Sequence, residues 1–250
     1  MDGQSSALAA RSGRPDRDIN MGCPARRVTG GASGSALMRE PDHALSLIEA
    51  VVKAVDVPVT IKMRLGWDDT TMNAPEIARR ARDAGISMIT VHGRTRCQFY
   101  KGKANRAAVS SVVDAVDIPV IVNGDIVDTA TTRLALGQSR AAGVMIGRGA
   151  IGKPWLIAAI AHGLEGRLLD LRPRGDAYVD LIKEHMTAHL DFYGTETGVR
   201  AMRKHLDAYL VQVPETADLR SRLIRETDPK ALFSGIDELG ARDQNWEVAA

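Results

Sequence analysis

The sequence predicts an α/β protein, a (β/α)8 TIM barrel with about five of the eight strands, followed by a C-terminal helical domain. From residue 57 onward, short β-branched runs alternate with longer Ala-rich amphipathic stretches, which is typical of βαβ units and a parallel sheet. From about residue 173 to 243 this alternation stops, and the chain has helical periodicity instead. We therefore expect segment 1–17 to be atypical, a partial barrel over 18–170 and a helical domain with a tail over 171–250.

Each expected strand ends in polar or glycine-containing residues. The first ends at Asn20 in "DIN", and the others are "VPVTIKMR" (57–64), "ISMITVHGR" (86–94), "IPVIVNGD" (118–125) and "AGVMIGR" (142–148). Helices are expected between and after them, over 74–85, 105–116 and 155–164. No G-x-G-x-x-G follows the first strand, and the last two strands end in "NGD" and "GRG". Both details favour a barrel over a doubly wound open sheet.

Composition excludes several classes of protein. The chain has 250 residues, of which 44% are hydrophobic and 26% charged, with a net charge of +2. It can bury a core, and any surface that binds nucleic acid has to be a local basic patch. Its two cysteines, Cys23 and Cys97, give neither a disulfide framework nor a zinc spacing, so a reducing cytoplasm is the expected compartment. The apolar runs are too short to span a bilayer, and the first twenty residues have no continuous apolar core.

The polar strand ends are the candidate site. Lys62 and His92 lie at or near the ends of neighbouring strands, with Arg94 just beyond His92, and together they suggest a cationic floor for an anionic cofactor. The next two strands end in glycine and charged residues that suit a phosphate or flavin pocket; these residues are Asn123, Gly124, Asp125, Gly147, Arg148 and Gly149. Each motif alone also fits an ordinary turn or a solvated strand end.

Cys23 stands between Gly22 and Pro24 and is followed by a Gly-rich loop. A free cysteine is commonly a small buried apolar residue, and we assign Cys97 to that class or to a loop. The backbone around Cys23 can instead expose its thiol as an acid or nucleophile.

The helical region contains a histidine pair that could bind a metal and a basic group that could bind RNA. "HMTAH" places His185 and His189 four residues apart, but no glutamate follows the first histidine and no third ligand is evident. We therefore expect a solvated helix face and no metal. The basic residues around Arg203, Lys204 and His205 are usually a solvated helix face too, and RNA binding by them is a local-patch hypothesis.

Five blocks, in this order, closely resemble the bacterial tRNA-dihydrouridine synthase family: "DINMGCP", "VTIKMRLGW", "ITVHGRTRCQFYKG", "VIVNGDI" and "GVMIGRGAIGKPWL". "RKHLDAYL" (203–210) is similar to that family's helical-domain motif, and the resemblance extends over about residues 18–235.

The resemblance implies an FMN-bound barrel and a helical tRNA-binding domain, in which NADPH reduces FMN and a hydride is delivered to C6 of uridine. Cys23 would protonate C5, because the flavin supplies only the hydride. FMN would be held by Lys62, His92, Asn123, Gly124, Asp125, Gly147 and Arg148. Arg64 and Arg94 would line the pocket, and the helical-domain motif, with Arg203, Lys204 and His205, would contact tRNA. We expect a monomer without membrane or metal partners.

The sequence departs from the family at its front, where the family has three further strands. Open edges and an uncovered core follow from a barrel of five strands, so we expect FMN binding by the isolated chain to be weak or absent. Two alternatives stay open at this point: a flavin-free RNA-binding remnant, and a Schiff-base aldolase or lyase with Lys62 as nucleophile.

Overall fold

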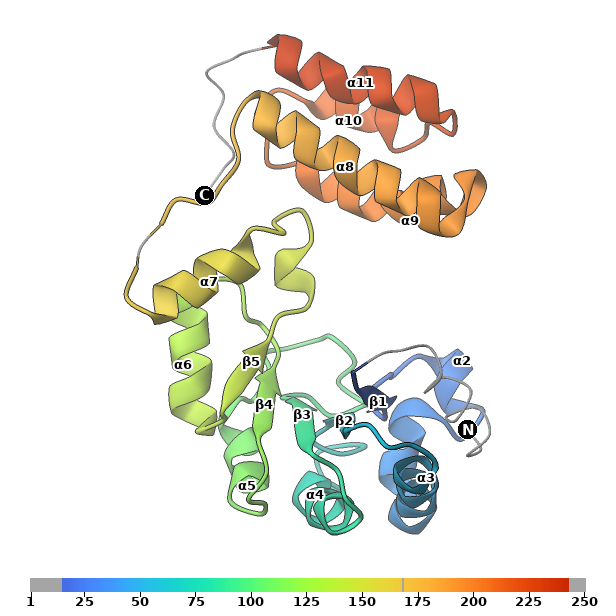
Figure 1. The fold of residues 1–250 in the computed structure, drawn as a ribbon, viewed down its shortest axis with the longest axis vertical. Helices are drawn as coiled ribbons and strands as arrows, with labels where there is room; N and C mark the ends of the chain where they lie inside the picture. Colours follow the sequence, from blue (N-terminus) through green and yellow to red (C-terminus); the bar gives the residue numbers. More distant parts are fainter. Residues whose placement is uncertain (1–14, 168, 243–250) are drawn as a thin grey trace. The chain divides into compact units, whose positions relative to one another are not determined.

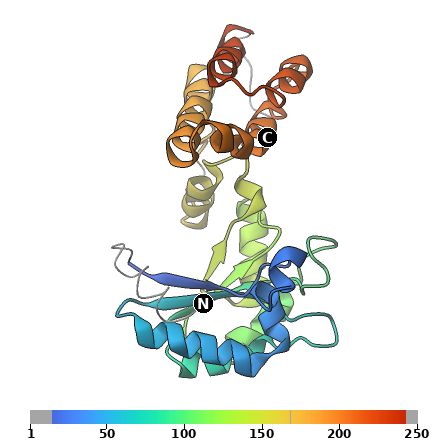
Figure 2. The same ribbon diagram turned by 90° about the vertical axis from the view of Figure 1, so that its right-hand side faces the viewer.

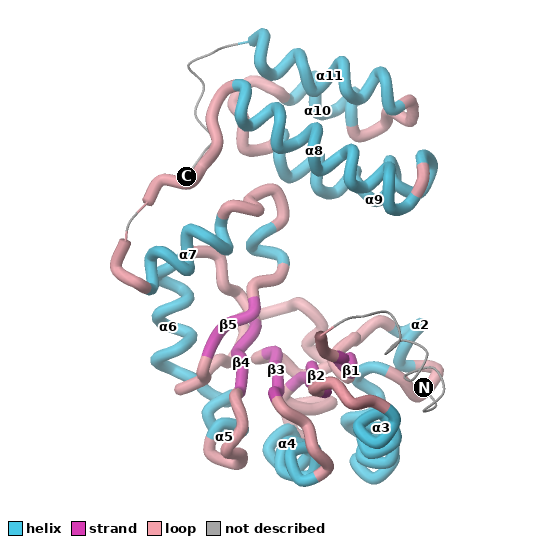
Figure 3. Tube along the Cα trace, viewed as in Figure 1, coloured by secondary structure: helices cyan, strands magenta, loops and turns pink. Residues whose placement is uncertain are grey.

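The computed structural model describes residues 15–167 and 169–242 and divides into two compact units, Met1–Gly147 and Arg148–Ala250. The first unit holds the β/α alternation, and the described part of the second contains helices and no strand. Figure 3 shows this change along the chain. Of the segment expected to be atypical, residues 1–14 lie outside the described residues, and Arg17 already begins a strand.

Five parallel strands form one sheet in the order β1-β2-β3-β4-β5. Every strand therefore lies beside its neighbour in sequence, as in the wall of a β/α barrel and unlike a doubly wound sheet, whose order reverses. The strands are β1 (Arg17–Asn20), β2 (Val59–Arg64), β3 (Met88–His92), β4 (Val120–Asn123) and β5 (Gly143–Met145). The expected fold is confirmed: an α/β chain whose five parallel strands are consistent with an incomplete TIM barrel.

Helices connect the strands and lie along one side of the sheet, where Figure 1 shows α3, α4, α5 and α6 one after another. Figure 2, turned by 90°, again places α3 on one side of β1 and β2. The helices of this unit are α2 (Arg26–Thr29), η1 (Gly34–Arg39), α3 (Pro41–Ala54), α4 (Ala74–Asp83), η2 (Ala107–Val109), α5 (Ser110–Val113) and α6 (Thr129–Ser139). The helix predicted over 105–116 is shorter than expected because Asn105 belongs to a loop, where its N–H bonds the carbonyl oxygen of Gly93.

The two faces of the sheet differ in chemistry. Register partners point to the same side of a parallel sheet, so alternate residues of all strands share a face. One face is apolar and fully buried, with Ile61, Met63, Ile89, Val91 and Val122. The other is polar, with Asp18, Thr60, Lys62, Arg64, Thr90, His92 and Asn123. A β/α protein of this type places its site at the carboxyl ends of the strands. On the polar face those ends are Arg64, His92 and Asn123.

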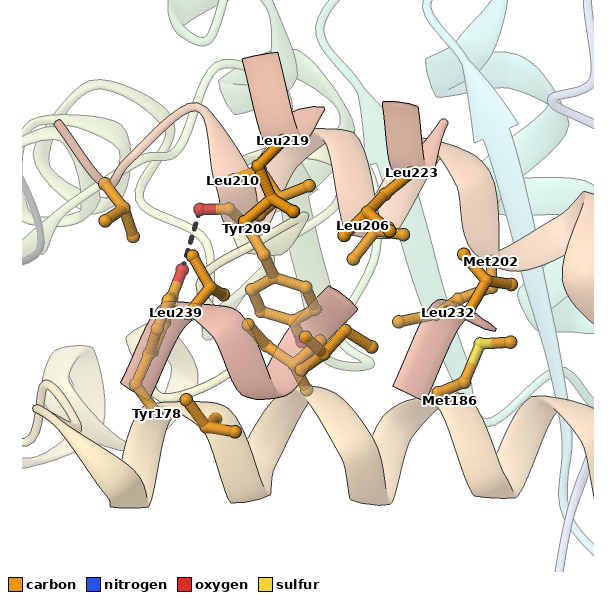
Figure 4. Packing of buried hydrophobic residues seen from close by; sticks show 14 of the residues in the cluster. Tyr178, Met186, Met202, Leu206, Tyr209, Leu210, Leu219, Leu223, Leu232 and Leu239 are labelled. Atoms are coloured by element: carbon orange, nitrogen blue, oxygen red, sulfur yellow. Dashed lines mark hydrogen bonds between the residues drawn. The ribbon is translucent and has the colours of Figure 1, made fainter. Parts of the chain in front are cut away.

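The second unit is a helical domain with its own core. Its elements are η3 (Arg148–Ala150), α7 (Leu156–Leu164), α8 (Asp176–Tyr193), α9 (Thr195–Leu210), α10 (Ala217–Leu223) and α11 (Pro229–Arg242). Buried leucines, methionines and two tyrosines from α8 to α11 pack together, and the hydroxyl of Tyr178 donates to the backbone oxygen of Tyr209 at 3.0 Å (Figure 4). Among the described residues, no helix has the length and apolarity needed to cross a bilayer.

Candidate active site at the carboxyl ends of the strands

Register brings the expected strand-end residues into one row. Arg64 pairs with His92, and His92 with Asn123, so these three side chains lie at one level on the polar face. Lys62 lies one step earlier on the same face and pairs with Asn20 of β1. Four strands thus contribute polar side chains to the same edge of the sheet.

The loop that carries Cys23 follows β1 and is fixed at several backbone atoms. The N–H of Gly22 donates to Oδ1 of Asn20 at 2.9 Å, which turns the chain at the strand end. The carbonyl oxygen of Cys23 accepts from both the N–H and the hydroxyl of Ser35, at 3.0 and 2.8 Å. Cys23 is half-buried and free. Because backbone groups make these contacts, the thiol itself is left for chemistry.

Gly34 makes the close approach to this loop possible. Its φ is +57°, and a Cβ there would lie 2.8 Å from the carbonyl oxygen of Cys23. Only glycine satisfies both conditions without strain. Asn20, Gly34 and Ser35 were not among the site residues expected from sequence, although the Gly-rich run after "GCP" was a signal for Gly34 and Ser35.

Arg64 connects the cysteine loop to the loop after β3. Its side chain is 1% exposed; its Nε donates to the carbonyl oxygen of Gly22 at 2.8 Å, and its Nη1 donates to those of Thr95 and Phe99 at 2.9 Å. A guanidinium has five N–H donors in a fixed plane, which suits it to hold several carbonyl groups at once. In this structure Arg64 orients the backbone beside Cys23.

Arg94 is held in a similar way on the neighbouring strand end. It is 2% exposed and donates to both carboxylate oxygens of Asp125, at 2.8 and 2.9 Å, and to the carbonyl oxygens of Lys101 and Gly102. Asp125 also accepts from the N–H of Ala104 at 2.8 Å. Together these bonds fix the loop after β3 against the "NGD" turn.

His92 is neutral in this setting. Nη1 of Arg94 lies 3.3 Å from Nε2 of His92, and because arginine only donates, Nε2 carries the lone pair and Nδ1 the proton. Burial, followed by the nearby cations Arg64, Lys62 and Arg94, lowers the pKa of His92 to about 3. His92 therefore offers a fixed N–H donor at neutral pH.

This lowered pKa predicts an acid-dependent loss of stability. A histidine that is kept neutral in the native state but titrates near 6.5 when unfolded makes unfolding take up a proton. We expect the unfolding free energy of the first unit to fall as the pH drops from about 6.5 toward 3, by up to about 1.4 kcal/mol per pH unit. His92→Gln should lose this slope.

The measurement is urea unfolding between pH 7 and pH 5 in a Trp155→Phe, Trp246→Phe background. Trp67 is then the remaining tryptophan and reports on the first unit. His43→Gln is the matched control: it removes an exposed histidine and leaves His92 in place, so the slope that His92 causes should remain. Equal slopes in wild type and His92→Gln would contradict the assignment.

The glycine and the asparagine of the "NGD" turn also belong to the carboxyl edge of the sheet. Gly124 has a φ of +128°, and a Cβ there would lie 3.0 Å from the ring of His92 and 2.7 Å from Cβ of Ala104. The Nδ2 of Asn123 donates to the carbonyl oxygen of Met145 at 2.7 Å, which joins β4 to the end of β5. Gly147 and Arg148 are exposed and follow β5; Arg148 is the first residue of the second unit.

Lys62 is the least satisfied cation of the row. Burial and the Arg64 guanidinium lower the pKa of its ammonium group, against smaller opposing effects of Asp18 and Cys23. Among the described residues, its Nζ has no hydrogen-bonded acceptor, and it would lie 3.5 Å from a Cβ at position 22. The site therefore carries desolvated positive charge beside the cysteine loop, which favours an anionic ligand.

The structure places the three expected RNA-binding residues on α9. Lys204 is exposed, and His205 faces two histidines of α8. Arg203 is half-buried, and its Nε has no hydrogen-bond partner among the described residues. They belong to the second unit and are not part of the strand-end row.

The sheet is parallel, and its carboxyl edge carries a cysteine loop, a desolvated lysine and glycine turns. These features define a β/α-barrel type of protein with its site at the strand ends. The family model of dihydrouridine synthase (Dus) matches residues 4–239. The chain belongs to the dihydrouridine synthase family.

Curated relatives have related names. "Probable tRNA-dihydrouridine synthase" of Rhodobacter capsulatus is 54% identical over 93% of this chain and 71% of its own length. The Rickettsia bellii protein of the same name is 49% identical over 88% of this chain and 68% of its length. "tRNA-dihydrouridine synthase B" of Xanthomonas campestris is 46% identical over 86% of this chain and 64% of its length. Among solved structures, 2,3-dimethylmalate lyase has a TM-score of 0.50 at 16% identity, over 66% of this chain and 60% of that one, a likeness of fold alone.

Proposed function

We propose that this chain reduces uridine to 5,6-dihydrouridine in tRNA, with FMN as cofactor, NADPH as reductant and Cys23 as general acid. The observation that carries the proposal is the cysteine loop, which is fixed through its backbone beside the desolvated Lys62 in a member of the dihydrouridine synthase family. The names of the relatives support the reaction and the tRNA substrate.

The donor set of the strand ends fits FMN. Lys62 offers an ammonium group that has no hydrogen-bonded acceptor in the described part of the chain, and His92 offers a neutral ring with a fixed Nδ1–H. We propose that these two residues, with Asn123, Gly124 and Asp125, hold the flavin, and that Gly147 and Arg148 bind its phosphate. When bound, FMN supplies the hydride for C6 of the uracil after reduction by NADPH.

The chain's own residues have separate tasks in this mechanism. Cys23 donates its proton to C5 of the uracil, so that both carbons of the double bond become saturated. Arg64 holds the carbonyl oxygen of Gly22 and thereby positions the thiol. Arg94 and Asp125 fix the neighbouring loop, and we regard both arginines as positioning residues.

The target uridine has to leave the tRNA stack to reach a site of this kind, so contacts remote from the chemistry are required. We propose that the helical domain supplies them through Lys204 and Arg203 on α9. Lys204 is exposed, and contacts of this type are weakened by salt because they neutralise phosphates.

The proposed reaction is tested directly with an unmodified tRNA transcript, added FMN and NADPH. Digestion to nucleosides and mass spectrometry should show dihydrouridine, and its formation should require both NADPH and FMN. Absence of dihydrouridine at saturating FMN would contradict the proposal.

Lys62→Met provides a test of the flavin site. Loss of one charge-assisted contact is expected to weaken FMN binding by about 10–100-fold, as followed by quenching of flavin fluorescence during titration. Lys53→Met, on the exposed side of α3, is the matched control and should bind FMN as wild type does. Trapping of a sugar phosphate on Lys62 by borohydride would instead favour the Schiff-base alternative.

A further inference from the structure

Three partly exposed histidines meet within the helical domain. His185 and His189 are four residues apart on α8, and His205 comes from α9. One ligand atom from each lies within 4.8 Å of those of the other two. The sequence showed the pair on α8, but the third imidazole becomes visible only when the two helices pack.

The packing of α8 on α9 is close because of glycines. Gly194 alone separates the two helices, with a φ of +73° that reverses the chain. A Cβ at Gly198 would lie 2.7 Å from the carbonyl oxygen of His189, so a larger residue there would push the helices apart. This close approach brings the ring of His205 beside those of both His185 and His189, so that the three rings form a triangle.

The ring geometry fits a shared metal ion. The ring centres are 4.8 Å apart for His185 and His205, 4.9 Å for His185 and His189, and 5.4 Å for His189 and His205. Three imidazoles that each bind a tetrahedral zinc ion through one nitrogen at about 2 Å place their ring centres about 5 Å apart. The observed rings need only side-chain rotation to point a nitrogen at one common centre.

The surroundings of the cluster suit a bound cation. The hydroxyl of Tyr209 lies 3.0 Å from Nδ1 of His185, so that nitrogen can donate its proton to the tyrosine and leave Nε2 for a metal. Nδ1 of His189 is buried without a partner among the described residues. All three side chains are partly exposed, which allows an ion and a water ligand to enter.

The charge state of the rings is compatible with metal binding. Burial, followed by His185 and Lys204, lowers the pKa of His205 to about 4, and burial is also the main cause that lowers the pKa of His185 and His189. The three rings are therefore neutral at pH 7, as metal ligation requires. The exposed Lys204 opposes a cation only weakly because solvent screens its charge.

We propose that His185, His189 and His205 form a binding site for one zinc ion or a similar divalent transition metal. Three imidazole nitrogens and a water complete the tetrahedron, and the ion joins α8 to α9. Imidazole ligands select zinc over magnesium, which prefers oxygen. The site would stabilise the helical domain independently of the proposed reduction of uridine.

Zinc binding by the full chain, freed of metal with a chelator, tests the proposal. Calorimetric titration with ZnCl2 should give one equivalent bound, and MgCl2 should give no binding. His189→Gln and His205→Gln should each weaken zinc binding at least about tenfold, and His43→Gln should not. Zinc should raise the melting temperature of wild type and of His43→Gln, but not of the two cluster variants. No binding by wild type, or undiminished binding by both cluster variants, would overturn the site.

A second measurement on the wild-type chain avoids any folding defect of the variants. Carbethoxylation by diethyl pyrocarbonate, followed by peptide mass spectrometry, reports on each histidine. Zinc should suppress modification of His185, His189 and His205 and leave His43 unchanged. Equal modification with and without zinc would contradict the proposal even if the variants misfolded.

Discussion

Cys23→Ala is expected to lower the rate of dihydrouridine formation by about 10²–10⁴-fold, the contribution of a well-placed general acid. The loss should be chemical and not structural, because Gly22 and Cys23 are held through backbone atoms that an alanine keeps. The measurement is single-turnover formation of dihydrouridine in a tRNA transcript at saturating FMN and NADPH. FMN affinity should stay within about twofold of wild type, since charge-assisted contacts to the flavin are unchanged.

Two further variants make this result specific. Cys97→Ala removes the other, exposed cysteine and should leave the rate unchanged. Cys23→Ser keeps a side chain of similar size, but its hydroxyl is a far weaker acid than a thiol, so its rate should resemble that of the alanine variant. A Cys23→Ala enzyme as fast as wild type would remove Cys23 from the proposed mechanism.

The strand-end row was accessible from the sequence because it depends on local patterns. Short β-branched runs with polar ends predict parallel strands, and the carboxyl ends of parallel strands share one edge. Lys62, His92 and Asn123 therefore lie together as expected from their places at strand ends. No side-chain contact had to be known for this inference.

The hydrogen-bond partners of the two arginines could not be predicted from the sequence in this way. Arg64 and Arg94 are almost fully buried and donate to backbone oxygens of the loop after β3, and no sequence pattern indicated these partners. That the two arginines line a pocket stays a prediction. The path of that loop decides which carbonyl groups face the two arginines. Because the loop has no sequence periodicity, that path could not be predicted. The contacts of Asp125 are equally nonlocal, since its carboxylate accepts from Arg94 and from the N–H of Ala104, both on the loop after β3.

The histidine cluster likewise depends on a contact between two helices, which the sequence pattern of either helix does not reveal. Spacing within α8 revealed His185 and His189, because four residues return a helix to the same face. His205 meets them through the turn at Gly194 and the close helix contact at Gly198. A sequence scan that considers one helix at a time cannot detect a third ligand of this kind.

The second large effect is expected for Asp125→Asn. The carboxylate of Asp125 is 31% exposed, and it is the ion-pair partner of the Arg94 guanidinium, which is 2% exposed. Asparagine would present an amide group to a buried cation and leave the charge without its counter-ion. Removal of one partner of a buried pair costs 3–5 kcal/mol, and the partial exposure here places the expected loss near the lower end, about 3 kcal/mol.

Urea unfolding in the background where Trp67 is the remaining tryptophan measures this loss in the first unit. Asp114→Asn is the matched control: it breaks the pair with Arg140, in which both side chains are more than half exposed, at 56% and 58%. Exposed pairs contribute little because solvent screens them, so this control should unfold with the wild-type midpoint. Equal midpoints for Asp125→Asn and Asp114→Asn would show that burial gives the Arg94 pair no special weight.

Removal of both charges distinguishes the ion pair from the other bonds of Arg94. If the pair alone mattered, Arg94→Leu combined with Asp125→Asn would recover stability, because no unpaired buried cation would remain. Arg94 also donates to the carbonyl oxygens of Lys101 and Gly102 and to Nε2 of His92. Leucine would leave these acceptors without a donor, and each unsatisfied buried acceptor costs about 1–3 kcal/mol. We therefore expect the double variant to be less stable than Asp125→Asn, since Arg94 organises a loop as well as balancing a charge.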